Sequence, residues 1–121
     1  MSSAGSAILG RKAGSPSRPA IDLEHLDRVT LGQEDLKRQV LALFVRQANE
    51  QVAGIRAAAT LEARSVAAHT LVGSARGVGA FSVAYVASEI ERSRGPIEGR
   101  LKALERATEA ARAFITNYLA H

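Results

Sequence analysis

The stretch QEDLKRQVLALFVRQANEQVAGIRAA, residues 33–58, decides the fold class of this 121-residue chain. Its apolar residues recur at spacings mostly of 3 and 4, and its charged and amide side chains fall mostly on the other faces. This period is typical of an amphipathic helix, so we predict a long helix that ends near Ala58. Its expected buried seam consists of Leu36, Val40, Leu43, Phe44, Ala48, Val52 and Ile55.

Helical patterns continue on both sides of this segment, and no strand pattern competes with them. The third helix should have Thr60 as its N-cap and end at Gly77 and Gly79. Its expected apolar side consists of Leu61, Ala68, Leu71, Val72, Ala75 and Val78. The other predicted helices cover about 21–28, from Phe81 to near the Arg94-Gly95-Pro96 break, and from Pro96 to about Leu119. Long helices with short connections predict an all-α fold, an up-down-up-down antiparallel four-helix bundle with a short leading helix.

The first 20 residues, MSSAGSAILGRKAGSPSRPA, are rich in Ser, Gly and Pro and show no apolar period. We interpret residues 1–20 as a flexible basic arm and residues 21–121 as the bundle domain. Arg11, Lys12 and Arg18 supply three of the four net positive charges, so the predicted domain is nearly neutral. A neutral domain argues against nucleic-acid binding, because neutralising phosphates requires a basic face.

Composition narrows the possible function classes further. The chain has no cysteine, which excludes disulfides, thiolate metal sites and a cysteine nucleophile. No apolar run approaches the roughly 20 residues that span a membrane, and Ala7-Ile8-Leu9 is too short for a signal sequence. We therefore expect a cytoplasmic protein that does not bind membranes.

The stretch AHTLVGSARGVGA, residues 68–80, contains the candidate for chemistry, a histidine in the middle of a helix among small residues. At 100° per residue, His69 shares a more exposed side of the helix with Ser65, Gly73 and Arg76. A free imidazole has a pKa of about 6.5, so at neutral pH most exposed histidines are uncharged and can act as nucleophiles. His69 is therefore the candidate catalytic residue.

Gly73 and Arg76 are candidate supporting residues. A glycine inside a helix costs roughly 0.5–1 kcal/mol relative to alanine, and Gly73 would keep the space around the His69 ring open. Arg76, two turns beyond His69, could reach a phosphoryl group or an acidic partner. A plainer interpretation also fits: a solvated histidine, a glycine that permits close helix packing and an ordinary surface arginine.

The same stretch resembles the signature of histidine-containing phosphotransfer (Hpt) domains, an Ala-His-x-Leu-Lys-Gly-Ser-type segment followed by glycine and a small residue. Residues 21–58 and the segment Ser88–Glu91 are similar to other helices of that family, so the resemblance covers roughly residues 21–119. The residues at matching positions are His69, Leu71, Gly73, Ser74, Gly79 and Ala80.

The resemblance implies that His69 accepts a phosphoryl group on Nε2 from a receiver-domain aspartyl phosphate or a kinase, and passes it to another receiver aspartate. The protein would be a covalent phosphocarrier rather than a turnover enzyme. Its implied partners are response-regulator receiver domains and a sensor histidine kinase, which can be a hybrid kinase. The receiver would supply Mg²⁺, so we expect no metal and no cofactor in this chain, and a monomer is the expected state.

One position departs from the family pattern. The family usually has lysine three residues after the histidine, and this chain has Val72 there. Valine cannot neutralise a phosphoryl group, so the charge would be met by Arg76, by backbone dipoles or by the partner. The departure supports an alternative function, a helical adaptor that docks receivers without exchanging phosphate. A second alternative, nucleic-acid or membrane-surface binding, would rest on the basic arm alone.

The other two histidines give little evidence of a site. We expect His25, in a short charged helix, to be solvated, and His121, the last residue, to be frayed. No His, Asp or Glu lies one turn beyond His69 on the same face, so a metal site at His69 is not expected.

Overall fold

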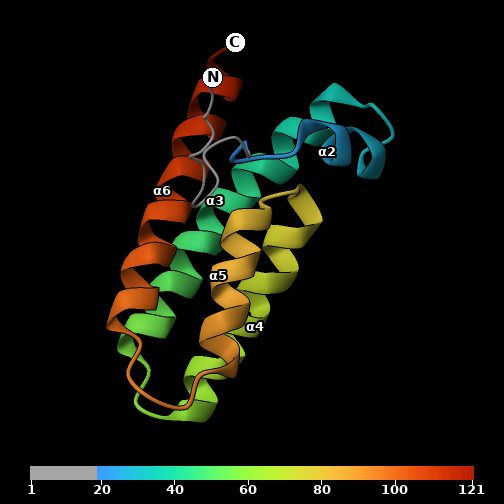
Figure 1. Cartoon of the computed structure of the whole chain (residues 1–121). Coiled ribbons are helices and arrows are strands. Elements are labelled where there is room, and N and C mark those ends of the chain that lie inside the picture. The colour runs from blue at the N-terminus through green and yellow to red at the C-terminus, as the bar shows by residue number, and fades with distance from the viewer. Residues whose placement is uncertain (1–18) are drawn as a thin grey trace, which may run out of the picture.

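The computed structural model describes residues 19–121, which form five helices and no strand (Figure 1). Residues 1–18, most of the predicted arm, lie outside the described residues. The helices are α2 (Leu23–Val29), α3 (Glu34–Ala57), α4 (Leu61–Val78), α5 (Phe81–Arg92) and α6 (Glu98–Ala120).

The four longer helices form an antiparallel bundle (Figure 1). The helices contact one another in a closed ring, α3 with α4, α4 with α5, α5 with α6, and α6 with α3. Short α2 packs against α4 at one end of the ring. The sequence prediction of an all-α four-helix bundle with a leading helix is therefore confirmed.

The cap of α4 follows the sequence prediction at its start and differs at its end. The Thr60 hydroxyl accepts a hydrogen bond from Ala63 N at 3.0 Å, as an N-cap residue should. The helix ends at Val78, and Gly79 is its C-cap with a φ of +84°. Gly77 lies inside the helix, so the prediction that it helps to end α4 was wrong. Only Gly79 adopts the left-handed conformation that stops the helix.

Two other helix starts differ from the prediction by two residues. The first helix begins at Leu23, because the Asp22 carboxylate accepts a hydrogen bond from His25 N and caps it. The last helix begins at Glu98, after Pro96 and the N-cap Ile97.

The buried seam of α3 matches the prediction from Phe44 onward and differs before it, where Leu36 and Val40 are only partly buried. Leu41 is fully buried and was missed, whereas Leu43 is 42% exposed. Leu41 fits the spacing of 3 and 4 that continues through Phe44, while Leu43 lies about 140° from the centre of this seam. Leu61, predicted on the apolar side of α4, is also 42% exposed, because it begins the helix at the open end of the bundle. The buried residues of α3 are Leu41, Phe44, Ala48, Val52 and Ile55.

The α4–α5 turn is joined to the start of α2. Asp22 N donates to Gly79 O at 2.9 Å, and Ile21 beside it is fully buried. A Cβ at position 79 would lie 2.9 Å from Asp22 O, so only glycine fits there without movement. This contact fixes the end of the hairpin made by α4 and α5, the two helices that form the candidate site.

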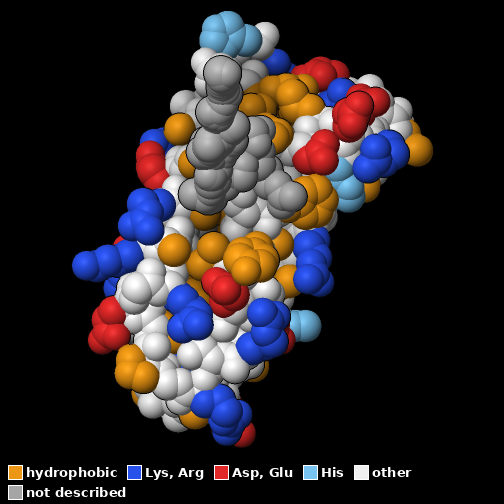
Figure 2. Space-filling model, in the orientation of Figure 1, with side chains coloured by type: hydrophobic (Ala, Val, Ile, Leu, Met, Phe, Trp, Pro, Cys, Tyr) orange, Lys and Arg blue, Asp and Glu red, His pale blue; other side chains and the backbone are white. Residues whose placement is uncertain are grey.

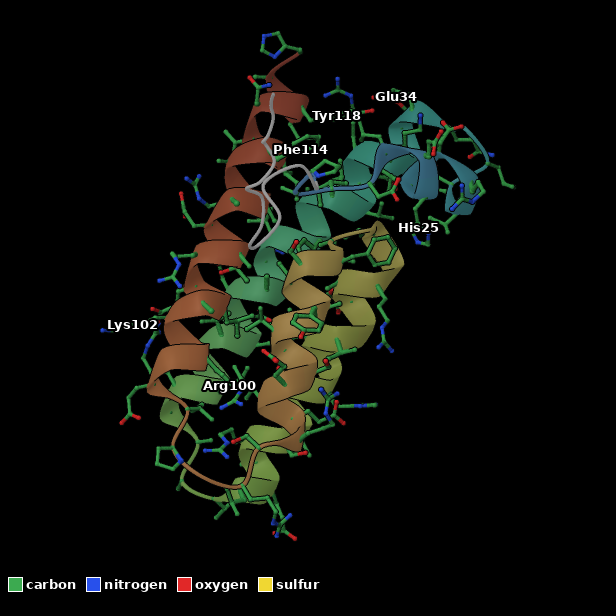
Figure 3. The ribbon with its side chains drawn as sticks, in the orientation of Figure 1. His25, Glu34, Arg100, Lys102, Phe114 and Tyr118 are labelled. Atoms are coloured by element: carbon green, nitrogen blue, oxygen red, sulfur yellow. The ribbon has the colours of Figure 1, made fainter. Side chains whose placement is uncertain are left out.

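The opposite pair of helices is joined at the same end of the bundle. The Tyr118 hydroxyl on α6 donates to the Glu34 carboxylate on α3, with distances of 3.1 and 3.0 Å to its two oxygens. Figure 3 labels both residues where these helices meet. The ring of helices is therefore tied by polar contacts as well as by its core.

Candidate functional site

His69 lies in the middle of α4, and 75% of its side chain is exposed. Its helical neighbours Ala68 and Leu71 are fully buried, so the helix is fixed in rotation while His69 faces outward. The exposure that the helical wheel predicts for His69 is confirmed.

The imidazole of His69 is held by a carboxylate from the next helix. His69 Nδ1 lies 2.8 Å from Glu91 Oε2 on α5. An ionised carboxylate only accepts hydrogen bonds, so Nδ1 must carry the proton in this pair. In the neutral ring, Nε2 then has a free lone pair, and it makes no hydrogen bond within residues 19–121. The arrangement presents one defined nitrogen as a nucleophile.

Glu91 was not predicted as a site residue, because it comes from a different helix. A signal was present in the numbering: in an antiparallel hairpin, residues equidistant from the turn lie opposite each other. His69 precedes Ala80 by eleven residues and Glu91 follows Ala80 by eleven. With the turn placed at Gly79 and Ala80, this equality identifies Glu91 as the residue opposite His69.

Two glycines extend the exposed face of α4 beyond His69. A Cβ added at Gly73 or at Gly77 would meet no atom within 4 Å. The interpretation that Gly73 permits close helix packing within the domain is therefore wrong. Each glycine costs the helix roughly 0.5–1 kcal/mol, with no packing reason inside the described part of the chain. Their effect is a low, open surface one and two turns from the His69 ring.

Arg76 is placed on the same side of α4 but is not brought to His69. It is exposed in the last turn of the helix, and its side chain makes no hydrogen bond or ion pair with any residue from 19 to 121. Two turns separate the two residues, about 10.5 Å along the axis. Val72, one turn from His69, is only 5% exposed and fills part of the core. No cation therefore lies at the position where the family usually has lysine.

Comparison with known families fits this geometry. Residues 39–119, well over half of the chain, match the family described as Hpt domain. The chain belongs to the Hpt domain family. No curated protein and no solved structure gives a significant match to it.

Membership gives this Hpt domain a phosphotransfer role in two-component phosphorelays. Hpt domains in general interact with receiver domains and histidine kinases. The match contains α4 and α5 with His69 and Glu91, and it begins after α2.

An open hollow adjoins the site of this Hpt domain. It lies between the start of α4 and the end of α5 and has a volume of about 400 Å³. Glu91, the partner of His69, is one of its lining residues, together with Ser65 and Val66 from α4. Two large apolar side chains are also exposed, Val66 on α4 at 66% and Tyr85 on α5 at 63%. The exposed faces of α4 and α5 thus carry apolar side chains available for contact with another protein.

The remaining histidines of the Hpt domain lie apart from this site. His25 is half-buried, and its ring packs edge-on against Phe81 with centroids 5.2 Å apart. The expectation that His25 is solvated was therefore wrong, because α2 folds back onto the α4–α5 turn. His121 Nδ1 lies 2.8 Å from Asn117 O at the end of α6. Within residues 19–121 no three His, Asp or Glu side chains are grouped as metal ligands.

Charge and hydropathy describe the rest of the surface. Figure 2 shows Lys and Arg side chains over the middle and lower parts of the bundle with acidic side chains among them, and side chains of both charges at the α2 end. None of the helices in the described part is long and apolar enough to cross a bilayer.

Proposed function

We propose that His69 is the phosphoacceptor of a phosphorelay and that the protein is a covalent phosphocarrier. The observation that carries the proposal is the exposed imidazole with Nδ1 paired to Glu91 and Nε2 free. A helix surface suits this role, because the partner can approach the nucleophile from the solvent side.

The proposed step is a displacement at phosphorus. The Nε2 lone pair forms the N–P bond, and the acyl phosphate O–P bond breaks with its electrons returning to the receiver's aspartate. The ring then carries a positive charge, shared with the Nδ1–H that faces Glu91, so the carboxylate stabilises the phosphorylated form. In the reverse step a receiver aspartate attacks phosphorus and neutral imidazole leaves. No proton has to move in either direction.

The neutralisation of the phosphoryl oxygens is assigned to the partner. Val72 supplies no charge, and we propose that Mg²⁺ is held by the receiver, with no metal or cofactor in this domain. Arg76 is the proposed additional contact to the phosphoryl group or to the receiver, since its side chain is exposed and unpaired within residues 19–121.

The proposed docking surface is the face of α4 and α5 around His69. The open positions at Gly73 and Gly77 allow a partner backbone to approach closely, and Val66 and Tyr85 offer apolar contacts. We propose that receiver domains and a sensor histidine kinase, which can be a hybrid kinase, bind there to a monomeric, cytoplasmic domain.

Phosphotransfer from a labelled receiver tests the proposal. Wild type and His69→Gln are incubated with a phosphorylated receiver domain and Mg²⁺, and the label is assayed for acid lability and alkali stability. We expect label of that kind on the wild type and none on His69→Gln. Label that persists in His69→Gln would refute the site.

The departure at Val72 favours one second candidate, an adaptor that binds receivers without chemistry. It predicts receiver binding by the wild type in a pull-down with no transfer from a donor that labels another Hpt domain. The third possibility is that the basic arm binds nucleic acid or a membrane surface. Deleting residues 1–20 tests it, because this binding would then be lost while phosphotransfer continued.

A further inference from the structure

Two side-chain hydrogen bonds join α4 to the end of α5 within residues 19–121. One is the His69–Glu91 pair, and the other runs from Arg64 Nη2 to Ser93 O at 2.9 Å. The donors lie five residues apart on α4, and the acceptors lie two residues apart on the antiparallel segment. Both bonds therefore act at the end of α5, one on its last turn and one on its C-cap residue, Ser93.

That turn needs support because of where Glu91 lies. It is the next-to-last residue of α5, and the carbonyls of a final helical turn have no intrahelical N–H partners. Ser93 N donates to Ile90 O, and Ile90 is fully buried, so the inner side of the turn is anchored. The chain beyond Ser93 leads into the exposed Arg94-Gly95-Pro96 segment, which gives the turn no buried anchor.

The outer side of the turn borders the open hollow. Glu91, Ser93 and Arg94 all line this hollow of about 400 Å³. The Glu91 side chain is 30% exposed, so its position depends on the backbone that carries it. Among the described residues, the Arg64 guanidinium is the side chain that ties this backbone to α4.

We infer that Arg64 is a positioning residue that holds the last turn of α5 so that Glu91 keeps His69 in the Nδ1–H form. The cation is suited to the task, because the carbonyl end of a helix carries partial negative charge. Its planar donor group also fixes direction better than an ammonium would. The inference rests on the proposed function only for the consequence, a free Nε2 for phosphorylation.

The test measures the His69 tautomer separately from phosphotransfer. Ring ¹⁵N chemical shifts of His69 are recorded in the full chain at about pH 8.5, where a free imidazole is neutral. The variants are Arg64→Met, which keeps the aliphatic stem, and Arg64→Lys, which keeps the charge. Arg46→Met is the matched control, because Arg46 is exposed on α3 and makes no side-chain hydrogen bond or ion pair within residues 19–121.

We expect Arg64→Met to lower the ratio of Nδ1–H to Nε2–H at His69 about 3-fold or more, the effect of weakening one modest hydrogen bond. Its phosphorylation rate should fall in proportion to the loss of the Nδ1–H population, Arg64→Lys should recover part of both, and Arg46→Met should match the wild type. Unchanged nitrogen shifts in Arg64→Met, or no recovery by lysine, would overturn the inference.

Two further outcomes separate this inference from the proposed function. If Arg64→Met changes the tautomer of His69 but no donor phosphorylates the wild type, Arg64 is still the positioning residue and the phosphocarrier is refuted. If the wild type is phosphorylated and Arg64→Met leaves the tautomer unchanged, the phosphocarrier stands and the inference about Arg64 is overturned. If Arg64→Met melts well below the wild type, Arg64→Gln replaces it, since glutamine keeps a polar head but is too short by about two bonds. The same fall in the ratio of Nδ1–H to Nε2–H at His69 is then expected.

Discussion

The two ring nitrogens of His69 are unequal because one of them faces a carboxylate. The pair with Glu91 is 2.8 Å long, and the imidazole is otherwise mostly in solvent. A free imidazole would divide its proton between the two nitrogens, so only part of the population would present Nε2 as a nucleophile. Glu91 removes this division and also faces the positive ring of the phosphorylated form.

Removing the carboxylate therefore has a predicted kinetic effect. Glu91→Ala should lower the rate of phosphorylation of His69 about 3- to 10-fold, the effect of losing a charge-assisted hydrogen bond at an exposed site. Glu91→Gln should fall between alanine and wild type, because the amide oxygen still accepts from Nδ1–H without the negative charge. Single-turnover transfer from a phosphorylated receiver measures both. Equal rates for all three proteins would contradict the role given to Glu91.

Val72 allows a gain-of-function prediction at the scale of one residue. It is 5% exposed and lies one turn from His69, so a lysine stem can replace its packing while the ammonium extends outward. Val72→Lys should raise the transfer rate several-fold by neutralising the phosphoryl group, and should cost about 1–2 kcal/mol of stability through lost core packing.

The matched control for this variant is Val72→Met, which has an unbranched stem of similar shape without the charge. Stopped-flow or quench measurements on both variants separate charge from packing. If Val72→Lys and Val72→Met transfer phosphate at the same rate, the missing ammonium is irrelevant to this domain, and the partner alone supplies the positive charge.

At the scale of the element, the α4–α5 hairpin depends on Gly79. An alanine there would take a φ of +84°, and its Cβ would approach Asp22 O to 2.9 Å. We expect Gly79→Ala to lower the free energy of unfolding by about 2–4 kcal/mol, combining left-handed strain with a backbone clash. Urea denaturation followed by circular dichroism measures it as a lower midpoint at constant slope.

Gly77→Ala is the control for this prediction, two residues away in the same helix. Its Cβ would meet nothing within 4 Å, and alanine is the better helix former, so stability should rise by about 0.5–1 kcal/mol. Destabilisation by both substitutions, or by neither, would show that helix propensity and the Asp22 contact do not govern this hairpin.

The helices could be predicted from the sequence where a local rule decides them. Thr60 predicts the start of α4, because its hydroxyl accepts a hydrogen bond from a backbone N–H in the first turn of the same helix. The period of 3 and 4 places most of the α3 seam, yet it leaves neighbouring leucines ambiguous. Leu41 and Leu43 are two residues apart, so they fall on nearly opposite sides, and only the actual rotation of the helix selects between them.

The candidate site was predictable only in part for a related reason. The exposure of His69 follows from the wheel of a single helix, whereas its contact with Glu91 requires knowing how two helices are aligned. The bond from Arg64 to Ser93 O has no sequence signal, because the acceptor is a main-chain carbonyl that any residue could supply. The openness at Gly73 likewise appears only when the surrounding atoms are in place.

At the scale of the whole molecule, ion pairs and hydrogen bonds connect three helices where α2 meets the bundle. Lys37 on α3 pairs with Asp27 on α2, and Arg38 pairs with Glu34 one turn before it. Arg38 also donates to Leu119 O and lies over the Tyr118 ring, so α6 joins the same group. The domain thus closes its ring of helices at the end away from the α5–α6 connection.

This group makes stability depend on alkaline pH. Partial burial, together with the hydrogen bond to Glu34, raises the pKa of the Tyr118 phenol above 10.0. The hydrogen bond to Asp27 raises the pKa of the Lys37 ammonium above 10.5. A raised folded-state pKa contributes stability that is complete below the unfolded pKa and is lost as pH rises through the folded value. The wild type should therefore lose stability above about pH 10.

Tyr118→Phe isolates the contribution of the phenol. Near neutral pH it should be less stable than the wild type by about 0.5–1 kcal/mol, because the hydroxyl no longer donates to Glu34. The difference should shrink as pH rises above about 10, since only the wild type then ionises a phenol beside a carboxylate. Urea midpoints across this range measure the gap.

Tyr85→Phe is the control, because the Tyr85 hydroxyl makes no hydrogen bond within residues 19–121. A gap that stays constant with pH for Tyr118→Phe, or that closes equally for Tyr85→Phe, would remove the phenol from the alkaline transition and leave Lys37 as its cause.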